Sequence, residues 1–353
     1  MQCEFESRTV HQVWLGNSTA ECWSEKPVDT VQFRAEPPDS GNLRLLGRDE
    51  VRKMTNRKRL IFDTSGINRF AEDRKSADPL IAGLISGYVV RVTATNVEES
   101  IATDNPEKRS RLLEVCKELI KGEGGEIIRP FHWITEELIT EFERNGAVNW
   151  GNISLRLPAY EREVALREVI DDAVAAQERA HAANVKATFE TVFTDARPHF
   201  EELFRSGKES RPSSVADLVS RLQGTGGAFW NFGHGLYERV AKRKPDEDTI
   251  RKFIAECPPF HALLLAICVA QYDLAIREED GTKPSSHRND LFMAVYLPYC
   301  DEFVSDDRGQ QSRLREIVSL CKLTTRVRWY REFRDSFCVN VVGPRGPVKK
   351  FEK

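Results

Sequence analysis

Carboxylates stand where several predicted strands end or the next helices begin. They are Asp63, Glu98, Glu99, Asp290, Asp306 and Asp307, with the hydroxyls of Thr64, Ser65 and Ser305 beside them. Because the carboxyl ends of parallel strands lie along one edge of a sheet, we expect these side chains to converge there. Carboxylates that converge without lysine or arginine partners repel one another, and a hard divalent cation such as Mg²⁺ or Mn²⁺ relieves that repulsion. Such an ion also neutralises phosphate charge and generates a hydroxide nucleophile, so the chemistry predicted is phosphodiester hydrolysis.

Each of these acids also has an ordinary structural interpretation. Asp63 and Asp290 are of the residue type that caps helix N-termini, and the acid pair in SDD suits a solvated turn. For any single acid the structural interpretation is the better one, since capping acids are common. Four acids at strand ends or helix starts, in the order in which these elements follow one another, favour one shared site over four separate structural roles.

The elements that would position the acids alternate between strand and helix on either side of a helical middle. Strands are expected at 59–62, 88–95, 126–131, 302–307 and 324–329. Helices are expected at 77–87, 106–122, 133–146, 289–300, 309–323 and 330–337. Strand, helix and strand in this alternation predict an α/β fold with a parallel sheet and right-handed crossovers.

The middle of the chain, residues 150–285, contains charged amphipathic helices and the apolar stretch LLLAICVAQYDLAI, which must be buried. We expect it to form a helical cap beside the acidic site; the alternative is a separate subdomain, with a homodimer interface facing away. The predicted organisation has five parts. They are an N-terminal extension (1–58), an α/β domain in two pieces (59–149 and 286–340) separated by a helical insertion (150–285), and a basic tail (341–353).

The stretches IFDTSGINRF, TNVEES, NDLFMAVYLPYCDEFVSDD and TTRVRWYREF together resemble the PIN domain family of metal-dependent nucleases. The resemblance covers about residues 58–145 and 286–340 and implies a three-layer fold with a parallel sheet flanked by helices. It implies that the catalytic metal ligands are Asp63, Glu99, Asp290 and Asp307. Glu98 and Asp306 are the competing acids, and Ser305, Thr64 and Ser65 lie beside the metal. The implied activity is a Mg²⁺- or Mn²⁺-dependent endoribonuclease.

Two other functions fit the same stretches. One is a structure-selective DNA nuclease, because the RNA preference comes from the family alone. The other is a non-catalytic scaffold of the same fold that binds a protein through the helical insertion. The long insertion departs from the compact family pattern, and this keeps the scaffold in consideration.

The composition narrows the partners and the compartment. The net charge is −3 over 353 residues, so nucleic-acid binding requires a local basic patch such as RKMTNRKR (52–59) or RVRWYREFR (326–334). The eight cysteines are scattered through apolar segments without a CxxC pair, which predicts buried reduced thiols in a cytoplasmic protein. No apolar run is long enough for a bilayer, so no membrane partner is expected.

The glycine-rich stretch GTGGAFWNFGHG (224–235) lacks the Gly-Lys-Ser/Thr of a phosphate-binding loop and has no strand before it. We interpret it as a helix junction in which Phe229, Trp230 and Phe232 pack. Base stacking on these aromatic rings is the less favoured alternative.

Overall fold

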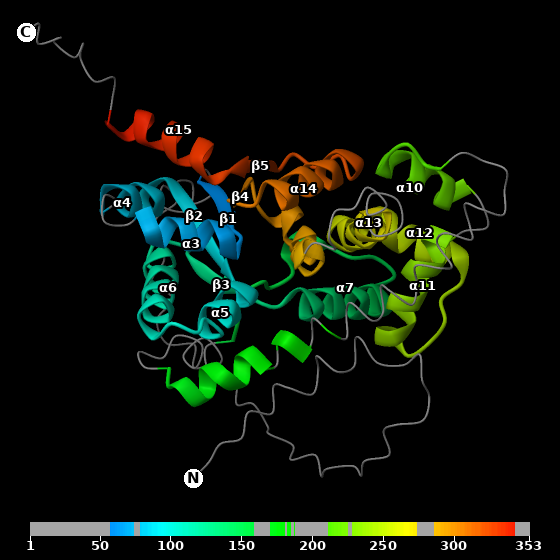
Figure 1. The fold of residues 1–353 in the computed structure, drawn as a ribbon. Helices are drawn as coiled ribbons and strands as arrows, with labels where there is room; N and C mark the ends of the chain where they lie inside the picture. Colours follow the sequence, from blue (N-terminus) through cyan, green and yellow to red (C-terminus); the bar gives the residue numbers. More distant parts are fainter. Residues whose placement is uncertain are drawn as a thin grey trace, which may run out of the picture. The chain divides into compact units, whose positions relative to one another are not determined.

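The computed structural model describes residues 57–73, 78–158, 170–180, 182–184, 187, 211–224, 228–273 and 286–342 (Figure 1). The chain divides into two units, 1–57 and 58–353, and the fold below is that of the second. The predicted N-terminal extension lies outside the described residues apart from its last two, and the basic tail lies outside them from residue 343 onward.

Five parallel strands form one sheet, as the alternation of strands and helices predicted. The strands are β1 (Lys58–Phe62), β2 (Tyr88–Thr93), β3 (Glu126–Ile128), β4 (Glu302–Ser305) and β5 (Arg326–Trp329). Their order across the sheet is β3-β2-β1-β4-β5, and every neighbouring pair is parallel. The α/β class is therefore confirmed, and β1 lies at the centre of the sheet.

One face of the sheet packs against a cluster of helices that follow β1, β2 and β5. These are α3 (Thr64–Asp73), α4 (Asp78–Gly87), α5 (Ala94–Ile101), α6 (Pro106–Leu119) and α15 (Tyr330–Val342). Leu60 and Phe62 of β1 are almost fully buried in this cluster with Phe70 of α3 and Phe333 of α15. Ile61 is equally buried but takes no part in it, because successive side chains of a strand point to opposite faces.

The other helices around the sheet contribute no buried residue to that cluster and pack on one another. They are α7 (Phe131–Asn145), the 3₁₀ helix η6 (Ser286–Tyr299) and α14 (Arg308–Leu320). α14 contacts β4 and β5, and η6 contacts α14 and α7. The sheet thus lies between two helical layers.

Between β3 and β4 the described residues contain helices and no strand. Besides α7 and η6, these helices are η3 (Trp150–Asn152), α10 (Val215–Gly224), α11 (Ala228–Ala241), α12 (Glu247–Glu256) and α13 (Pro258–Tyr272), and residues 172–180 are also helical. α13 is apolar and buried over most of its length and packs chiefly against η6. Pro258 and Pro259 begin α13 after a break that separates it from α12, and the two helices are bent by 103° at this break. No single described helix has both the length and the apolar character needed to cross a membrane.

Three local expectations are settled by particular residues. The strand expected at 88–95 ends at Thr93, because Thr93 and Asn96 form a reciprocal capping box that starts α5. The helix expected at 289–300 is a 3₁₀ helix with Pro298 inside it. In the glycine-rich stretch, Phe229 is fully buried, and a Cβ at Gly233 would lie 2.8 Å from Ile254 Cδ1, so this glycine permits close helix packing.

Candidate active site at the carboxyl ends of the strands

Asp63 and Asp307 follow β1 and β4, the two neighbouring strands at which the order of the sheet reverses. From β1 the chain proceeds to β2 and β3 on one side, whereas β4 leads to β5 on the other. Ligands of open α/β sheets bind outside the carboxyl ends of the strands at such a switch point. The backbone N–H of Asp63 donates to the Val304 carbonyl at 3.0 Å, which holds the two strand ends together. The topology therefore places Asp63 where a binding site is favoured.

Asp63 is buried among three hydrogen-bond donors, with 4% of its surface exposed. The Gly66 N–H donates to Oδ1 at 2.6 Å, and the hydroxyls of Ser65 and Ser305 lie 2.8 and 2.9 Å from Oδ2. Burial raises the pKa of Asp63 to about 7; these hydrogen bonds lower the pKa in part, and the charge of Asp290 raises it. The carboxyl group therefore changes its charge near neutral pH.

Asp63 is at the same time the N-cap of α3, since its carbonyl accepts from the Ile67 N–H at 3.0 Å and its side chain accepts from Gly66. Gly66 has no room for a side chain, because a Cβ would lie 2.9 Å from the Val304 carbonyl oxygen and 3.0 Å from Asp63 Oδ1. The structural interpretation of Asp63 as a cap is thus confirmed. This cap uses Oδ1, so it does not by itself exclude a second role for Oδ2 of Asp63.

The hydroxyl protons around Asp63 have more than one acceptor. Ser65 Oγ accepts two backbone N–H groups of the loop after β4, at 2.9 and 3.1 Å, and lies 2.8 Å from Asp63 Oδ2 and 3.3 Å from Ser305 Oγ. Ser305 Oγ lies 2.9 Å from Asp63 Oδ2, 2.8 Å from Gln310 Oε1 and 3.3 Å from the Asp307 carbonyl oxygen. Because a hydroxyl donates only one proton, Ser305 serves one of these acceptors at a time. When Ser65 donates to Asp63 and Ser305 donates to Gln310, two of the roughly four lone-pair positions of Asp63 stay open to another ligand.

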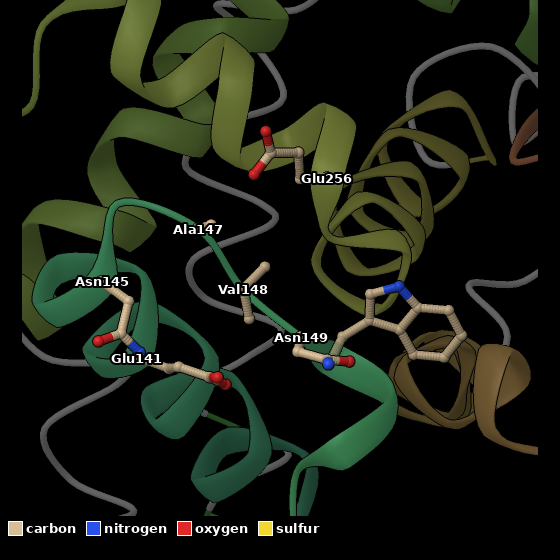
Figure 2. Close-up of a pocket in the computed structure, with 7 residues that line it drawn as sticks. Glu141, Asn145, Ala147, Val148, Asn149 and Glu256 are labelled. Carbon is tan, nitrogen blue, oxygen red and sulfur yellow. The ribbon is translucent and has the colours of Figure 1, made fainter.

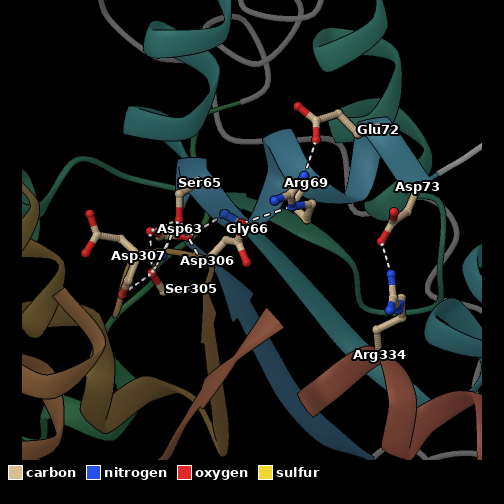
Figure 3. Close-up of polar contacts among 10 residues, drawn as sticks. All are labelled: Asp63, Ser65, Gly66, Arg69, Glu72, Asp73, Ser305, Asp306, Asp307 and Arg334. Atoms are coloured by element: carbon tan, nitrogen blue, oxygen red, sulfur yellow. Dashed lines mark hydrogen bonds and ion pairs between the residues drawn. The ribbon is translucent and has the colours of Figure 1, made fainter. Parts of the chain in front are cut away.

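The two acids after β4 have structural partners. Asp307 is the N-cap of α14 and accepts from the Gln310 N–H at 2.9 Å; Figure 3 shows its carboxylate turned away from Asp63. Asp306 Oδ2 accepts from Arg69 Nε at 3.0 Å in an ion pair (Figure 3). The expectation that these acids lack a cationic partner is therefore wrong for Asp306. The expectation fails because Arg69 is more than 200 residues from Asp306 in the sequence, and the two side chains meet only in the folded structure.

Glu98 and Glu99 lie in α5, close behind the strand end of β2. Burial raises the pKa of both carboxyl groups to about 7. A hydrogen bond with Thr64 lowers the pKa of Glu99 in part and the charge of Asp290 raises it, whereas Glu178 and Glu99 raise that of Glu98. The Glu99 side chain is exposed although protein surrounds its carboxyl group, so solvent screens its charge more than that of Asp63.

Asp290 links the two acidic positions electrostatically, since its charge raises the pKa of both Asp63 and Glu99. No lysine or arginine is among the groups that shift these two pKa values. Asp290 lies inside η6 rather than at the first turn of an α-helix, and its carbonyl accepts from Gln310 Nε2 at 3.2 Å. The structure therefore brings together Asp63, Glu99 and Asp290, and directs Asp306 and Asp307 to other partners.

Three residues that support this site were not predicted from the sequence. Asn96 is fully buried and donates from Nδ2 to Thr64 Oγ at 3.1 Å, which connects α5 to the start of α3. Gln310 is also buried and joins Ser305 to Asp290. Arg69 neutralises Asp306. The pattern Thr-x-x-Asn at 93–96 is a recognisable capping signal, whereas Gln310 and Arg69 carry no local signal.

The basic run expected to grip phosphate lies partly outside the described residues. Arg57, Lys58 and Arg59 are described, and the last two are paired at the amino ends of the strands, the edge opposite Asp63. Lys58 Nζ lies 3.0 Å from Glu302, and Arg59 Nε lies 3.1 Å from Asp301. The suggestion that these two residues bind phosphate beside the site is therefore wrong.

Two hollows stand out on the described part of the surface. The larger, of about 560 Å³, is lined by Glu141 and Asn145 of α7, the 147–150 segment and Glu256 of α12 (Figure 2). None of the acids at the strand ends lines it. The smaller, of about 360 Å³, includes Arg69 and Asp306 and therefore adjoins the acidic site.

Comparisons of this chain with protein-family models, with curated proteins and with solved structures give no match. The fold and the site define an α/β protein with a five-stranded parallel sheet. Its acidic side chains gather beside the switch point of that sheet.

Proposed function

We propose that this chain is a metal-dependent nuclease that hydrolyses phosphodiester bonds in RNA as an endoribonuclease. The observation that carries the proposal is the gathering of Asp63, Glu99 and Asp290 from three separate segments beside the switch point; within the described part of the chain, no cation is among the groups that shift the pKa values of the first two. The resemblance of the strand-end stretches to the PIN domain family supports the reaction and is the source of the RNA preference.

The donor chemistry of these residues fits Mg²⁺ or Mn²⁺, which take hard oxygen ligands. Among the residues that the structure describes, no three His, Cys, Asp or Glu side chains are close enough to hold an ion as they stand. Binding therefore requires the carboxylates of Asp63, Glu99 and Asp290 to draw together, and Asp307 would join them only by leaving its cap. When bound, the ion would stabilise negative charge on the phosphate.

The chain's own hydroxyl and amide groups orient the acids. Ser65 and Gly66 fix the plane of the Asp63 carboxylate, while Ser305 can give its proton to Gln310 and leave Oδ2 open. Thr64 lies between Asn96 and Glu99 and contacts both. These contacts hold the carboxyl groups of Asp63 and Glu99 in defined positions, from which they would draw together around a cation.

The helical middle is proposed to cap this site, and a cytoplasmic location is part of the same proposal. Arg109 and Arg179 pair with Asp172 and Asp104, which holds helical residues 172–180 against the connection between α5 and α6. Glu178 lies close enough to Glu98 to raise its pKa. Four described cysteines, Cys116, Cys257, Cys268 and Cys300, are free and buried, as the sequence predicted.

A non-catalytic scaffold is the second candidate, and the caps formed by Asp63 and Asp307 favour it. Under this alternative the strand-end acids only begin helices. DNA as the substrate differs from the main proposal in specificity and not in mechanism.

Metal-dependent thermal stability separates the two candidates. We expect Mn²⁺ to raise the melting temperature of the full chain, since a ligand at a hundred times its Kd adds about 2.7 kcal/mol of stability. Asp63→Asn, which keeps a capping oxygen, should abolish this gain. Asp246→Asn is the matched control, because Asp246 caps α12 in the same way at an exposed position and should keep the full response. A wild-type melting curve that ignores millimolar Mn²⁺ would instead support the scaffold.

A further inference from the structure

The hollow beside the acidic site is lined by four arginines, two aspartates and two aromatic residues. The arginines are Arg69, Arg308, Arg331 and Arg334, and this hollow is called the arginine pocket below. Its volume of about 360 Å³ is within the range of small-ligand sites. It shares Asp306 with the loop that follows β4, so it directly adjoins the Ser305–Asp63 hydrogen bond.

Two of the four arginines are paired with acids. Arg69 contacts Asp306 at 3.0 Å and Glu72 at 2.6 Å, and Arg334 contacts Asp73 at 2.8 Å and Asp335 at 3.0 Å (Figure 3). Arg308 and Arg331 are exposed and make no ion pair with any acid that the structure describes. These two guanidinium groups are therefore the ones in the pocket that an anion can reach without displacing a described acid.

Trp329 holds these two unpaired arginines. The guanidinium carbon of Arg308 lies 4.2 Å from the centre of the Trp329 ring, and that of Arg331 lies 5.1 Å from it. Cation–π contacts at such distances restrain the long side chains without neutralising their charge. Both guanidinium groups thus contact the same ring, and among the described residues no side-chain hydrogen-bond partner is seen for either.

The positions of both arginines on their helices are electrostatically unfavourable. Arg308 is the first residue of α14 and Arg331 the second of α15, so each cation stands at the positive end of a helix dipole. A cation there is disfavoured, whereas an anion is favoured by the dipole and by the arginine together. Asp307 at the start of α14 and Glu332 in the first turn of α15 supply part of that negative charge, and an anionic ligand would add to it.

We propose that the arginine pocket binds a backbone phosphate of a single nucleic-acid strand, next to the phosphodiester that reaches Asp63. The substrate class rests on the proposed nuclease function; the anion site itself rests on Arg308, Arg331 and Trp329. Guanidinium groups bind phosphate through forked hydrogen bonds, which suits two arginines that contact one aromatic ring at the rim of a hollow. The pocket supplies the local basic patch that a chain of net charge −3 needs for binding nucleic acid.

Binding measured without metal tests this proposal independently of cleavage. The probe is a fluorescein-labelled single-stranded RNA of about a dozen nucleotides, titrated with full-length protein in EDTA and followed by fluorescence anisotropy. The double variant Arg308→Ala/Arg331→Ala should weaken binding by about tenfold or more at low salt. It should also lower the slope of log K against log salt by about 0.7, since the pocket neutralises one phosphate and each phosphate contact on a single strand contributes about 0.7.

Arg326→Ala is the matched control. Arg326 is exposed, as Arg308 and Arg331 are, but it lies at the amino end of β5, outside the pocket, so affinity and slope should stay near wild type. Equal losses in the control and the double variant would overturn the proposal, as would wild-type protein that binds no oligonucleotide. If the protein binds anionic phospholipid vesicles instead of RNA, and the double variant loses that binding, the proposal is wrong and the pocket contacts a membrane surface. If RNA binding depends on Arg308 and Arg331 but no RNA is cleaved, the anion site stands and the proposed nuclease function is wrong. If RNA is cleaved but the double variant binds it as wild type does, the nuclease function stands and the anion site is wrong.

Discussion

The two edges of the sheet carry the same residue types in opposite electrostatic states. At the amino edge, Asp301 pairs with Arg59, and the buried Glu302 lies 3.0 Å from Lys58 and 3.2 Å from Arg328. At the carboxyl edge, Asp63 has hydroxyl and amide donors but no basic partner. Burial raises the pKa of Asp301, but the hydrogen bonds and charge of Arg59 outweigh it and leave that pKa lowered, whereas burial prevails at Asp63.

This difference separates acids that stabilise the fold from acids that are available for chemistry. A buried carboxylate without a counter-ion opposes folding, so its presence at a switch point calls for a compensating role. The paired edge needs no further explanation. At the carboxyl edge, a divalent cation beside Asp63 would supply the positive charge that no described residue gives to this carboxylate.

The largest effect expected from this comparison is on cleavage. Asp63→Asn and Asp290→Asn should each lower kcat/KM on a labelled RNA by more than about 100-fold, since even the outer partners of a metal site cost about 10–100-fold. Cleavage should depend on Mg²⁺ or Mn²⁺ and stop with EDTA. The assay is single-turnover gel analysis of full-length protein.

Asp301→Asn provides the control at the paired edge and should cleave at the wild-type rate per folded molecule. Wild-type cleavage by Asp290→Asn would assign the activity to another site. Equal losses at the two edges would show that unfolding, and not chemistry, explains the effect.

The next effect is on stability, and its sign differs between the edges. Asp63 ionises near 3.8 in the unfolded chain and near 7 in the fold, so it destabilises the fold increasingly from about pH 4 to pH 7. Its upper limit is about 4 kcal/mol, at about 1.4 kcal/mol for each pKa unit. Asp63→Asn should therefore melt a few degrees higher than wild type at pH 8 and equally at pH 4.

Asp301 behaves in the opposite way. Its lowered pKa contributes stability above about pH 4 that is lost as the pH falls through the folded pKa. Asp301→Asn should therefore melt below wild type at pH 8, and the gap should close in acid. Thermal melts in EDTA across this pH range measure both variants, and changes of the same sign at pH 8 would remove the contrast between the edges.

Much of the fold could be predicted from the sequence because its signals are local. The apolar runs of β1 and β4, the proline at the start of α6 and the break at Pro258 each act within a few residues of their own position. The strand order follows from parallel pairing. The strand end at Thr93 was misplaced because a capping box competes with the β-branched residues around it.

The site was predictable only as a set of candidate acids. Their position at strand ends pointed to Asp63, Glu99 and Asp290, but the ion pair of Asp306 with Arg69 depends on packing between α3 and the loop after β4. The arginine pocket was out of reach for the same reason. Trp329, Arg308 and Arg331 meet only after two strands and two helices are assembled.

The smallest effect expected is a shift of the pH profile in Ser305→Ala. Ser305 is fully buried and its hydroxyl lies 2.9 Å from Asp63 Oδ2, where it lowers the pKa of that carboxyl group. Removal of the hydroxyl raises this pKa further, so the acidic limb of kcat/KM against pH should move upward by less than about one unit. Ser100→Ala is the matched control, because Ser100 is equally buried and bonds to the Asn96 carbonyl at 2.6 Å without contacting Asp63. Both variants should lose about 1–3 kcal/mol of stability, but only Ser305→Ala should move the acidic limb. An unchanged limb in Ser305→Ala would show that the ionisation of Asp63 does not control cleavage.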